Sequence, residues 1–325
     1  MVAEKLAASA AVTFVLLCIA CEPDVVFSSA LNAEGGFGGS VDTSTVGAGG
    51  NGAGAQSTAA QGASSPGGAA AGGQGGGSSS VGGGASGGIT GGDSVGTYYN
   101  PGITWELRNS NTTGTADLTF TYGGGDLVPV VGDWDGDGID TIGRFFPASA
   151  IWELRNSNTS GPPDLSFSYG GGNMIPVVGD WDGDGVDSVG AFHASSYTWE
   201  LRNSNTAGVP DVTFNYGAGN MIPLVGDWDG DGVDSIGGFH ASTYTWELRN
   251  SNTAGVPDVT FNYGAGNPIP LVGDWDGDGV VTIGTFYDPT PTWELRNSNT
   301  VGPPDVTFAF GSGDVVPLTG NWDGL

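Results

Sequence analysis

A short acidic loop, "GDWDGDGID", occupies residues 132 to 140 and carries side chains that could bind a metal ion. Counted from Asp133, carboxylates stand at relative positions 1, 3 and 5, a glycine at position 6, and the backbone carbonyl of Ile139 at position 7. This is the oxygen spacing of a Ca²⁺ loop, and the glycine permits the sharp turn that such a loop needs. The loop offers neither histidine nor cysteine, so its chemistry favours Ca²⁺ over transition metals.

The same spacing occurs in four loops, which predicts about four calcium sites. Their expected ligands are Asp133, Asp135, Asp137 and Ile139; Asp180, Asp182, Asp184 and Val186; Asp227, Asp229, Asp231 and Val233; and Asp274, Asp276, Asp278 and Val280. The alternative is an Asp/Gly turn that binds nothing. Two carboxylates ~5 Å apart repel by roughly 3 kcal/mol at an effective dielectric near 20, so a loop without a cation would be held open by its own charge.

The acidic loops belong to a larger repeat with a period of 47 residues. The octapeptide "WELRNSNT" occurs five times, starting at Trp105, Trp152, Trp199, Trp246 and Trp293. Each unit contains four short apolar or alternating segments, such as "LVPVVGD", "DTIGRFF", "IWELRN" and "DLSFSYG", separated by Gly, Pro, Asn and Asp turns. Repeated four-stranded units predict an all-β fold, a five-bladed β-propeller with repeats over 93–139, 140–186, 187–233, 234–280 and 281–325.

The ends of the repeated region indicate how the ring closes. The region begins with the second strand of a unit, "SVGTYY", and ends with a first strand, "VVPLTGNW". The C-terminal strand would therefore complete the N-terminal blade and leave no edge strand unpaired. An open stack, or a fragment of a longer propeller, would leave both ends unpaired.

The "GDWDGDGxDxxGxF" units resemble the FG-GAP and VCBS repeats of bacterial surface proteins, which are related to the calcium-binding blades of integrin α-subunits. The resemblance covers residues 93 to 325 and implies a calcium loop between the first and second strands of each blade. The family's acidic residue at position 9 is absent. Here position 9 is a hydroxyl residue, namely Thr141, Ser188, Ser235 or Thr282.

An aspartate stands at position 8 of three loops instead, as Asp140, Asp187 and Asp234. Either this aspartate completes the site or the position-9 hydroxyl does, and we favour the aspartate. On that interpretation the fourth loop, which has Val281 at position 8, binds most weakly. A fifth loop is divided between Asn321 and Asp323 at one end of the chain and Asp93 at the other, so we expect little or no metal there.

The first 92 residues indicate export and tethering. Residues 1–21 combine Lys5 with an apolar run that ends "LLCIAC", which resembles a bacterial lipoprotein signal with Cys21 as the lipidated residue. An ordinary cleaved signal and an uncleaved segment are the alternatives. Residues 22–92 are largely Gly, Ser and Ala and predict a disordered tether. We expect a protein exported to the cell surface, held at the membrane only by a lipid anchor.

The composition limits the possible functions. A net charge of -28, from 7 basic and 35 acidic residues, argues against a nucleic-acid partner. Each glutamate of the repeats lies in a "WELRN" strand, which indicates ionic pairs between strands or blades rather than catalytic dyads. His193 and His240 stand where other units have Tyr99, Phe146 or Tyr287, so they replace an aromatic residue.

We therefore expect a non-enzymatic binding or adhesion module for a glycan or protein ligand. "RNSNT" loops and the aromatic residues of each unit are the candidate contacts, although packing and turn formation explain the same residues. A propeller enzyme such as a glycoside hydrolase, and a passive surface scaffold, are the alternatives.

Overall fold

The computed structural model describes residues 92–324 apart from residue 172. The export segment with Cys21, and the tether up to residue 91, lie outside the described residues. The described part contains twenty β-strands and one 3-10 turn, Asn100–Gly102. Within it, no helix is long and apolar enough to cross a membrane.

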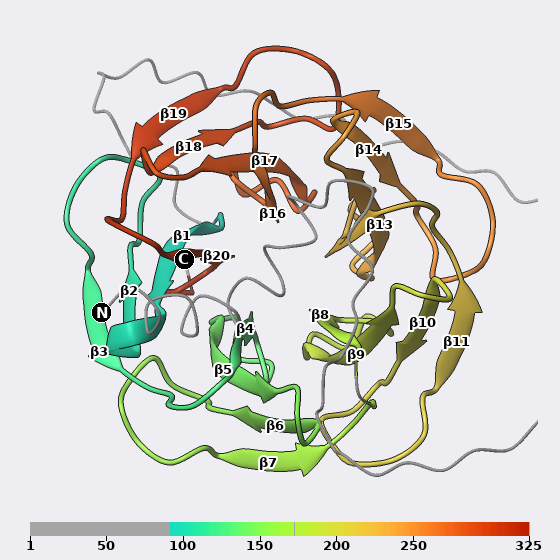
Figure 1. Cartoon of the computed structure of the whole chain (residues 1–325), viewed down its shortest axis with the longest axis horizontal. Helices are drawn as coiled ribbons and strands as arrows, with labels where there is room; N and C mark the ends of the chain where they lie inside the picture. Colours follow the sequence, from blue (N-terminus) through green and yellow to red (C-terminus); the bar gives the residue numbers. More distant parts are fainter. Residues whose placement is uncertain (1–91, 172, 325) are drawn as a thin grey trace, which may run out of the picture. The chain divides into compact units, whose positions relative to one another are not determined.

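The strands form five antiparallel sheets of four strands, arranged as blades in a ring (Figure 1). Blade 1 contains β1 (Ser94–Tyr99), β2 (Thr104–Leu107), β3 (Leu118–Thr121) and β20 (Val316–Gly320). Blade 2 contains β4 (Val128–Gly132), β5 (Thr141–Phe146), β6 (Ile151–Leu154) and β7 (Leu165–Ser168). Blade 3 contains β8 (Ile175–Gly179), β9 (Ser188–His193), β10 (Thr198–Leu201) and β11 (Val212–Asn215). Blade 4 contains β12 (Met221–Gly226), β13 (Ser235–His240), β14 (Thr245–Leu248) and β15 (Val259–Asn262). Blade 5 contains β16 (Ile269–Gly273), β17 (Thr282–Tyr287), β18 (Thr292–Leu295) and β19 (Val306–Ala309).

The repeated tryptophan anchors the core of each blade. In "TWEL" the Trp and Leu side chains are buried while the Thr and Glu side chains are partly exposed, as the two-residue period of a strand requires. Trp199, which is fully buried, donates from Nε1 to the carbonyl of Tyr216 at 3.0 Å and packs against Phe192 with ring centroids 4.8 Å apart. The indole thus buries a large apolar surface without leaving its N–H unpaired.

Neighbouring blades share their cores through one apolar residue. The second residue of each second strand, fully buried, belongs to the apolar cluster of the preceding blade: Ile142, for example, packs with Trp105 and Leu107 of blade 1. Val95 does the same for blade 5. The core is therefore continuous around the ring, and each blade depends on its neighbours.

The ring closes through β20, which pairs antiparallel with β1 from Ser94 opposite Gly320 to Tyr98 opposite Val316. The innermost strand of blade 1 thus comes from the C-terminal end of the chain (Figure 1). The predicted five-bladed ring closed by the C-terminal strand is confirmed, and the open stack is excluded. Closure pairs the two terminal strands, β1 and β20, whose edges would otherwise be left free to template aggregation.

Candidate functional sites

Each of the four acidic loops brings three carboxylates together. In blade 2 the loop connects β4 to β5, and single carboxylate oxygens of Asp133, Asp135 and Asp137 all lie within 4.8 Å of one another. Equivalent groups form in the other three loops, from Asp180, Asp182 and Asp184; from Asp227, Asp229 and Asp231; and from Asp274, Asp276 and Asp278.

Backbone groups fix the geometry of these loops. Asp133 Oδ1 accepts a hydrogen bond from Gly136 N at 2.8 Å, and Asp133 Oδ2 accepts one from Gly138 N at 2.7 Å. Gly136 and Gly138 have φ values of 74° and 85°, a region that favours glycine. Oδ1 also accepts from Asp137 N at 3.2 Å, whereas Oδ2 accepts a single hydrogen bond. Asp133 can therefore organise the turn through both oxygens and still offer the second lone pair of Oδ2 to an ion.

The charge of the loops is not balanced by the chain itself. Among the ion pairs of the described residues, none includes an aspartate of these four groups. The pKa of Asp135 is raised by partial desolvation and by the charges of Asp137 and Asp133. Three convergent, uncompensated carboxylates fit an oxygen-preferring divalent cation. The position-7 carbonyls of Ile139, Val186, Val233 and Val280 stay a prediction.

The position-8 aspartates lie at the junctions between blades, and the structure does not bring them into the carboxylate groups. Asp187 Oδ2 accepts a hydrogen bond from Asp133 N at 2.8 Å, and Asp187 N donates to Asp133 O at 2.8 Å. Asp234 binds Asp180 in the same way. The sequence cannot reveal this placement because the partner lies one full repeat away.

The remaining junctions follow the same pattern with one exception. Asp140 accepts from Asn321 N at 2.7 Å, and Asp93 accepts from Asp274 N at 2.8 Å. Val281 takes this place in blade 5 and keeps only the backbone bond to Asp227 O. Val281 stands in the fourth acidic loop but contacts the third, which begins at Asp227. Its lack of a carboxylate therefore gives no reason to expect weaker metal binding in the fourth loop.

The position-9 hydroxyls also bind the backbone. Thr141 Oγ1 donates to Gly132 O at 3.3 Å, and Ser188 Oγ donates to Arg202 O at 2.7 Å. Neither of the two side chains proposed to complete the metal site therefore points into the carboxylate group. The divided fifth loop is closed by Asn321, whose Oδ1 accepts from Gly324 N at 3.0 Å.

Burial makes the four junction aspartates hard to ionise. Desolvation, followed by the charge of Asp93, raises the pKa of Asp140 from 3.8 to about 8. Desolvation is also the main cause of the raised pKa values of Asp93, Asp187 and Asp234. Because these carboxylates raise one another's pKa values around the ring, they form one interacting set, called here the junction ring.

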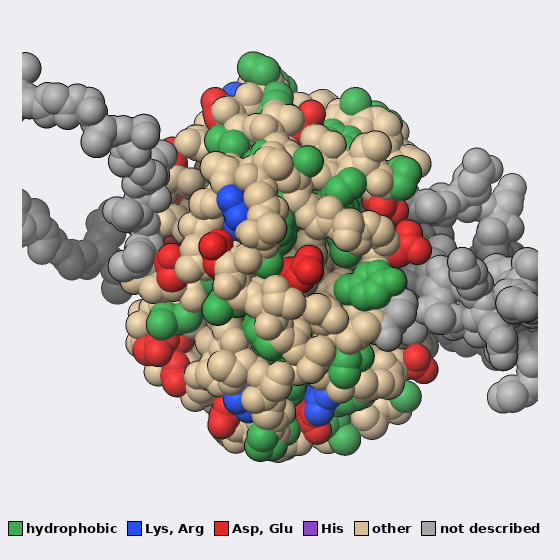
Figure 2. Space-filling view, turned by 90° about the vertical axis from the view of Figure 1, so that its left-hand side faces the viewer, with side chains coloured by type: hydrophobic (Ala, Val, Ile, Leu, Met, Phe, Trp, Pro, Cys, Tyr) green, Lys and Arg blue, Asp and Glu red, His purple; other side chains and the backbone are tan. Residues whose placement is uncertain are grey.

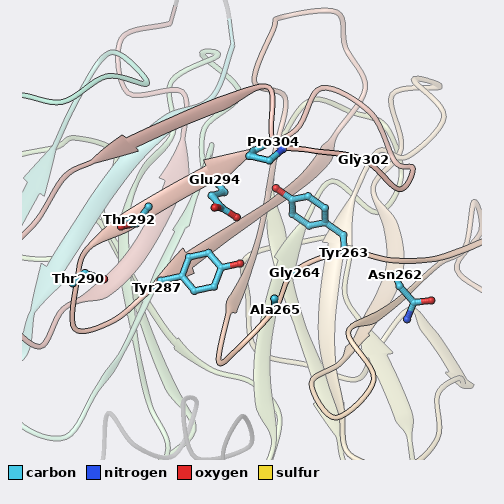
Figure 3. A pocket seen from close by; sticks show the side chains of 10 residues that line it. All are labelled: Asn262, Tyr263, Gly264, Ala265, Tyr287, Thr290, Thr292, Glu294, Gly302 and Pro304. Atoms are coloured by element: carbon cyan, nitrogen blue, oxygen red, sulfur yellow. The ribbon is translucent and has the colours of Figure 1, made fainter.

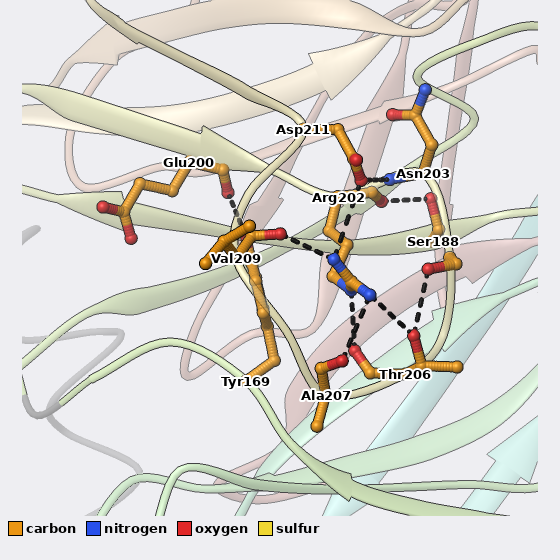
Figure 4. A network of polar contacts seen from close by, with 10 residues as sticks. Tyr169, Ser188, Glu200, Arg202, Asn203, Thr206, Ala207, Val209 and Asp211 are labelled. Atoms are coloured by element: carbon orange, nitrogen blue, oxygen red, sulfur yellow. Dashed lines mark hydrogen bonds and ion pairs between the residues drawn. The ribbon is translucent and has the colours of Figure 1, made fainter.

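The "RNSNT" loops are held by their own arginines (Figure 4). Arg202 Nε donates to Thr206 O at 2.8 Å, and its terminal nitrogens donate to Val209 O, Thr206 Oγ1 and Ala207 O at 2.6, 2.8 and 3.1 Å. The other four units repeat this arrangement with Arg108, Arg155, Arg249 and Arg296. The arginines are thus occupied within their own loops, which favours a role in turn formation over ligand contact.

We expect Arg202→Ala to destabilise the propeller by about 2–3 kcal/mol, since the loop loses the charge-assisted hydrogen bonds that hold its carbonyl groups in place. For a domain of this size that corresponds to a fall in Tm of roughly 5–10 °C, measured by differential scanning calorimetry. Arg202→Lys should lose nearly as much, because an ammonium group cannot reproduce the planar fork of donors. An unchanged Tm in both variants would contradict this role.

The cleft between blades 4 and 5 is the strongest candidate for ligand binding. It forms a shallow depression of about 630 Å³ that is open to solvent, lined by Asn262 and Tyr263 from blade 4 and by Tyr287, Thr292 and Glu294 from blade 5. Figure 3 shows the Glu294 carboxylate and the hydroxyl groups of both tyrosines directed into the same space. We call this site the Glu294 cleft.

Two buried hydroxyl groups of this region lack a partner. Tyr263 and Thr285 are 6% and 0% exposed, and neither Tyr263 Oη nor Thr285 Oγ1 has a hydrogen bond of good geometry. Burial raises the pKa of Tyr263 to about 12, so its hydroxyl stays protonated at neutral pH and can donate. Tyr263 lines the cavity whereas Thr285 does not, so a ligand could supply a partner to the Tyr263 hydroxyl alone.

The equivalent glutamates in three other clefts are paired with a cationic or titratable side chain of the chain. Glu153 pairs with Arg144, and His193 Nε2 lies 3.1 Å from Glu200 Oε2. His240 Nε2 lies 3.2 Å from Glu247 Oε2. The expected ionic pairing is therefore found for Glu153, with Arg144 as its partner in place of a "WELRN" arginine, whereas Glu200 and Glu247 contact histidines.

Sequence reasoning recognised the aromatic position of Tyr287 but missed the cleft itself. No local pattern distinguishes Asn262 or Tyr263, and the repeat predicts a cation partner for Glu294. The available signal is a difference between repeats: Thr285 stands where blade 2 has Arg144, as Thr97 does in blade 1, but only the Glu294 cleft combines this threonine with Tyr263, which is Phe310 in the next cleft. Of the aromatic residues of each unit, Tyr98 and Phe145 are fully buried in the core and do not reach a ligand.

No protein-family model matches the chain, and no curated protein does. The resemblance to FG-GAP and VCBS repeats is therefore not supported by a family match. Among solved structures, a lectin from Agrocybe aegerita, described as recognising non-reducing terminal N-acetylglucosamine, matches with a TM-score of 0.36 and 18% identity. The match covers 59% of this chain and 56% of the lectin chain, and it carries no argument about function.

Proposed function

We propose that this protein is a calcium-stabilised β-propeller that binds glycans at the Glu294 cleft. The observation that carries the proposal is the cleft's composition, in which two tyrosine rings, one carboxylate and side-chain amide and hydroxyl groups surround one cavity. Binding sites for small ligands combine aromatic walls with a few convergent polar groups in this way. Tyrosine suits such a wall because it presents an apolar face together with a polar hydroxyl.

Calcium is the second part of the proposal. Each group of three aspartates, with the position-7 carbonyl, would supply oxygen ligands to one Ca²⁺, and the ion would neutralise the repulsion within the loop. The described region contains no cysteine, so no disulfide stabilises it. We infer that the ions have a structural role at the junctions between the first and second strands.

A glycoside hydrolase is the less favoured alternative. Glycoside hydrolysis generally requires two carboxyl groups on opposite sides of the scissile bond. Among the described residues that line the Glu294 cleft, Glu294 is the single carboxylate. This composition favours recognition over hydrolysis.

The location of the module is also proposed from the sequence alone. A lipidated Cys21 and a long Gly-rich tether would place the propeller at the cell surface, where glycans and divalent calcium are both present. Metabolic labelling with a fatty-acid analogue, compared between the native chain and Cys21→Ser, tests the anchor. Equal labelling of the two proteins would contradict it.

We expect the full chain to bind a defined subset of glycans on an array in calcium-containing buffer. Tyr263→Phe should weaken binding of these glycans by about 10-fold, because a single unpaired donor is lost. The same variant should be as stable as the native protein or more stable, since the lost hydroxyl has no partner in the free protein.

Tyr216→Phe is the matched control, because Tyr216 occupies the equivalent position in the cleft where His240 pairs with Glu247. It should leave glycan binding unchanged. An array without specific signals, or equal effects of the two variants, would contradict the proposed site.

A further inference from the structure

In the cleft between blades 1 and 2, the aromatic and acidic side chains bind a cation of the chain itself, the guanidinium group of Arg144. Its guanidinium carbon lies 4.6 Å from the ring centroid of Tyr122 and 5.2 Å from that of Phe146. Its Nε donates to Glu153 Oε2 at 2.6 Å. A planar cation is therefore held between two aromatic faces and paired with a carboxylate, an arrangement that combines cation–π attraction with charge-assisted hydrogen bonding.

The Glu294 cleft contains the same recognition groups without the cation. Three repeats later, Tyr122, Phe146 and Glu153 correspond to Tyr263, Tyr287 and Glu294, whereas Arg144 corresponds to Thr285. Thr285 is too short to reach the carboxylate as arginine does, and no ion pair within the described residues includes Glu294. Glu294 and both tyrosines line the cavity of this cleft.

The next cleft along the ring shows how the chain can fill this space in another way. Between blades 3 and 4, His240 pairs with Glu247 and the Met221 sulfur packs against Gly238, which is the equivalent of Thr285. In the Glu294 cleft the residue equivalent to Met221 is Pro268, which has a shorter side chain. The shorter proline leaves free the space that the methionine side chain fills in the neighbouring cleft.

The propeller has no spare cation for this position. The repeats contain six arginines and no lysine. Five arginines are bound within their own "RNSNT" loops, and the sixth is Arg144. Figure 2 shows acidic side chains spread over the face that it presents, with few basic ones among them. The field of so acidic a protein raises the local concentration of cationic ligands.

From these observations we propose that the Glu294 cleft binds a cationic group of its ligand between Tyr263 and Tyr287, in the place that Arg144 occupies in its own cleft. This inference rests on the proposed function: for a glycan ligand, the cation is the protonated amine of an amino sugar. Thr292 and the side-chain oxygen of Asn262 then remain to bind sugar hydroxyl groups, since Asn262 Nδ2 already donates to Thr243 O and Thr245 Oγ1.

Isothermal titration calorimetry of the full chain, in calcium buffer at mildly acidic pH, tests the proposal. The ligands are a glucosamine tetramer, which carries free amines, and its fully N-acetylated counterpart. We expect the amine form to bind at least 10-fold more tightly, with the difference decreasing as salt concentration rises. Glu294→Gln, which is nearly isosteric, should abolish the preference for the amine.

Two reciprocal variants use the chain's own cation as a control. Thr285→Arg should place a guanidinium group in the cleft and reduce binding at least 10-fold. Arg144→Thr should open one further equivalent site and raise the stoichiometry by one ligand per chain relative to the native protein. Circular dichroism and Tm confirm that each variant is folded, and Glu294→Gln keeps the test decisive if Thr285→Arg does not fold.

The outcomes separate this inference from the proposed function. If both tetramers bind equally and Glu294→Gln has no effect on the ratio, the cation site is wrong although glycan binding stands. If neither tetramer binds but argininamide does so in a Glu294-dependent manner, the cation site is supported and the glycan function is wrong. If neither the tetramers nor argininamide bind, the cation site is overturned.

Discussion

We expect chelation of calcium to lower the Tm of the propeller by about 10–20 °C. Four sites with affinities of about 0.1 mM, in about 1 mM Ca²⁺, each contribute roughly 1.4 kcal/mol, or about 5–6 kcal/mol together. That sum is comparable to the net stability of a whole domain, and each kcal/mol corresponds to roughly 2–4 °C at this size. Differential scanning calorimetry of the full chain, in calcium and then in excess EGTA, measures the shift, which added calcium should reverse.

Single-loop variants divide this effect among the sites. Asp135→Asn should lower the Tm by about a quarter of the chelation effect and should reduce the further loss on chelation by the same amount. Asp126→Asn is the control, since Asp126 is exposed and lies outside the acidic loops. Equal Tm values with and without EGTA would refute the structural role of calcium.

Asp140→Asn stabilises the propeller at pH 8 and has little effect near pH 4. The pKa of Asp140 is raised from 3.8 to about 8, chiefly by desolvation, so ionisation costs more in the folded state than in the unfolded state. Its contribution to stability is fully present below pH ~4 and is lost as the pH rises toward 8. An asparagine keeps an oxygen that can accept from Asn321 N, but it carries no charge.

We expect a gain of about 2 kcal/mol for Asp140→Asn at pH 8, less than the pKa shift alone would give because the side chain retains some exposure and shares the ring with other carboxylates. Val281, in the equivalent position of blade 5, already shows that the ring accepts an uncharged residue. Thermal unfolding of both proteins between pH 4 and 9, at constant EGTA, provides the test. Native stability that rises from pH 5 to 8, in parallel with the variant, would contradict this account.

The repeat made the fold predictable from sequence. Trp199 and its four counterparts set the register of the period, and alternation within "TWEL" identified the buried face of each third strand. The unpaired strands at the two ends of the region predicted closure through β20. These inferences depend on local patterns and on their recurrence, both of which a single sequence contains.

The functional geometry was less predictable because it depends on contacts between repeats. Asp187 appeared to belong to its own loop, yet its carboxylate binds the backbone of Asp133 in the preceding blade. The Glu294 cleft joins Tyr263 of one blade to Glu294 of the next, so no local pattern contains it. The most informative residue of this cleft is Thr285. Its role can be inferred only when the structure shows that Arg144, at the equivalent position of blade 2, pairs with the glutamate of its cleft.

The most direct test of the account is a crystal structure of the propeller grown in calcium and soaked with the tightest-binding glycan. We predict ligand density in the Glu294 cleft, with an amine or other polar group against the Glu294 carboxylate and the rings of Tyr263 and Tyr287. Ligand density at another surface, with this cleft empty, would contradict the account.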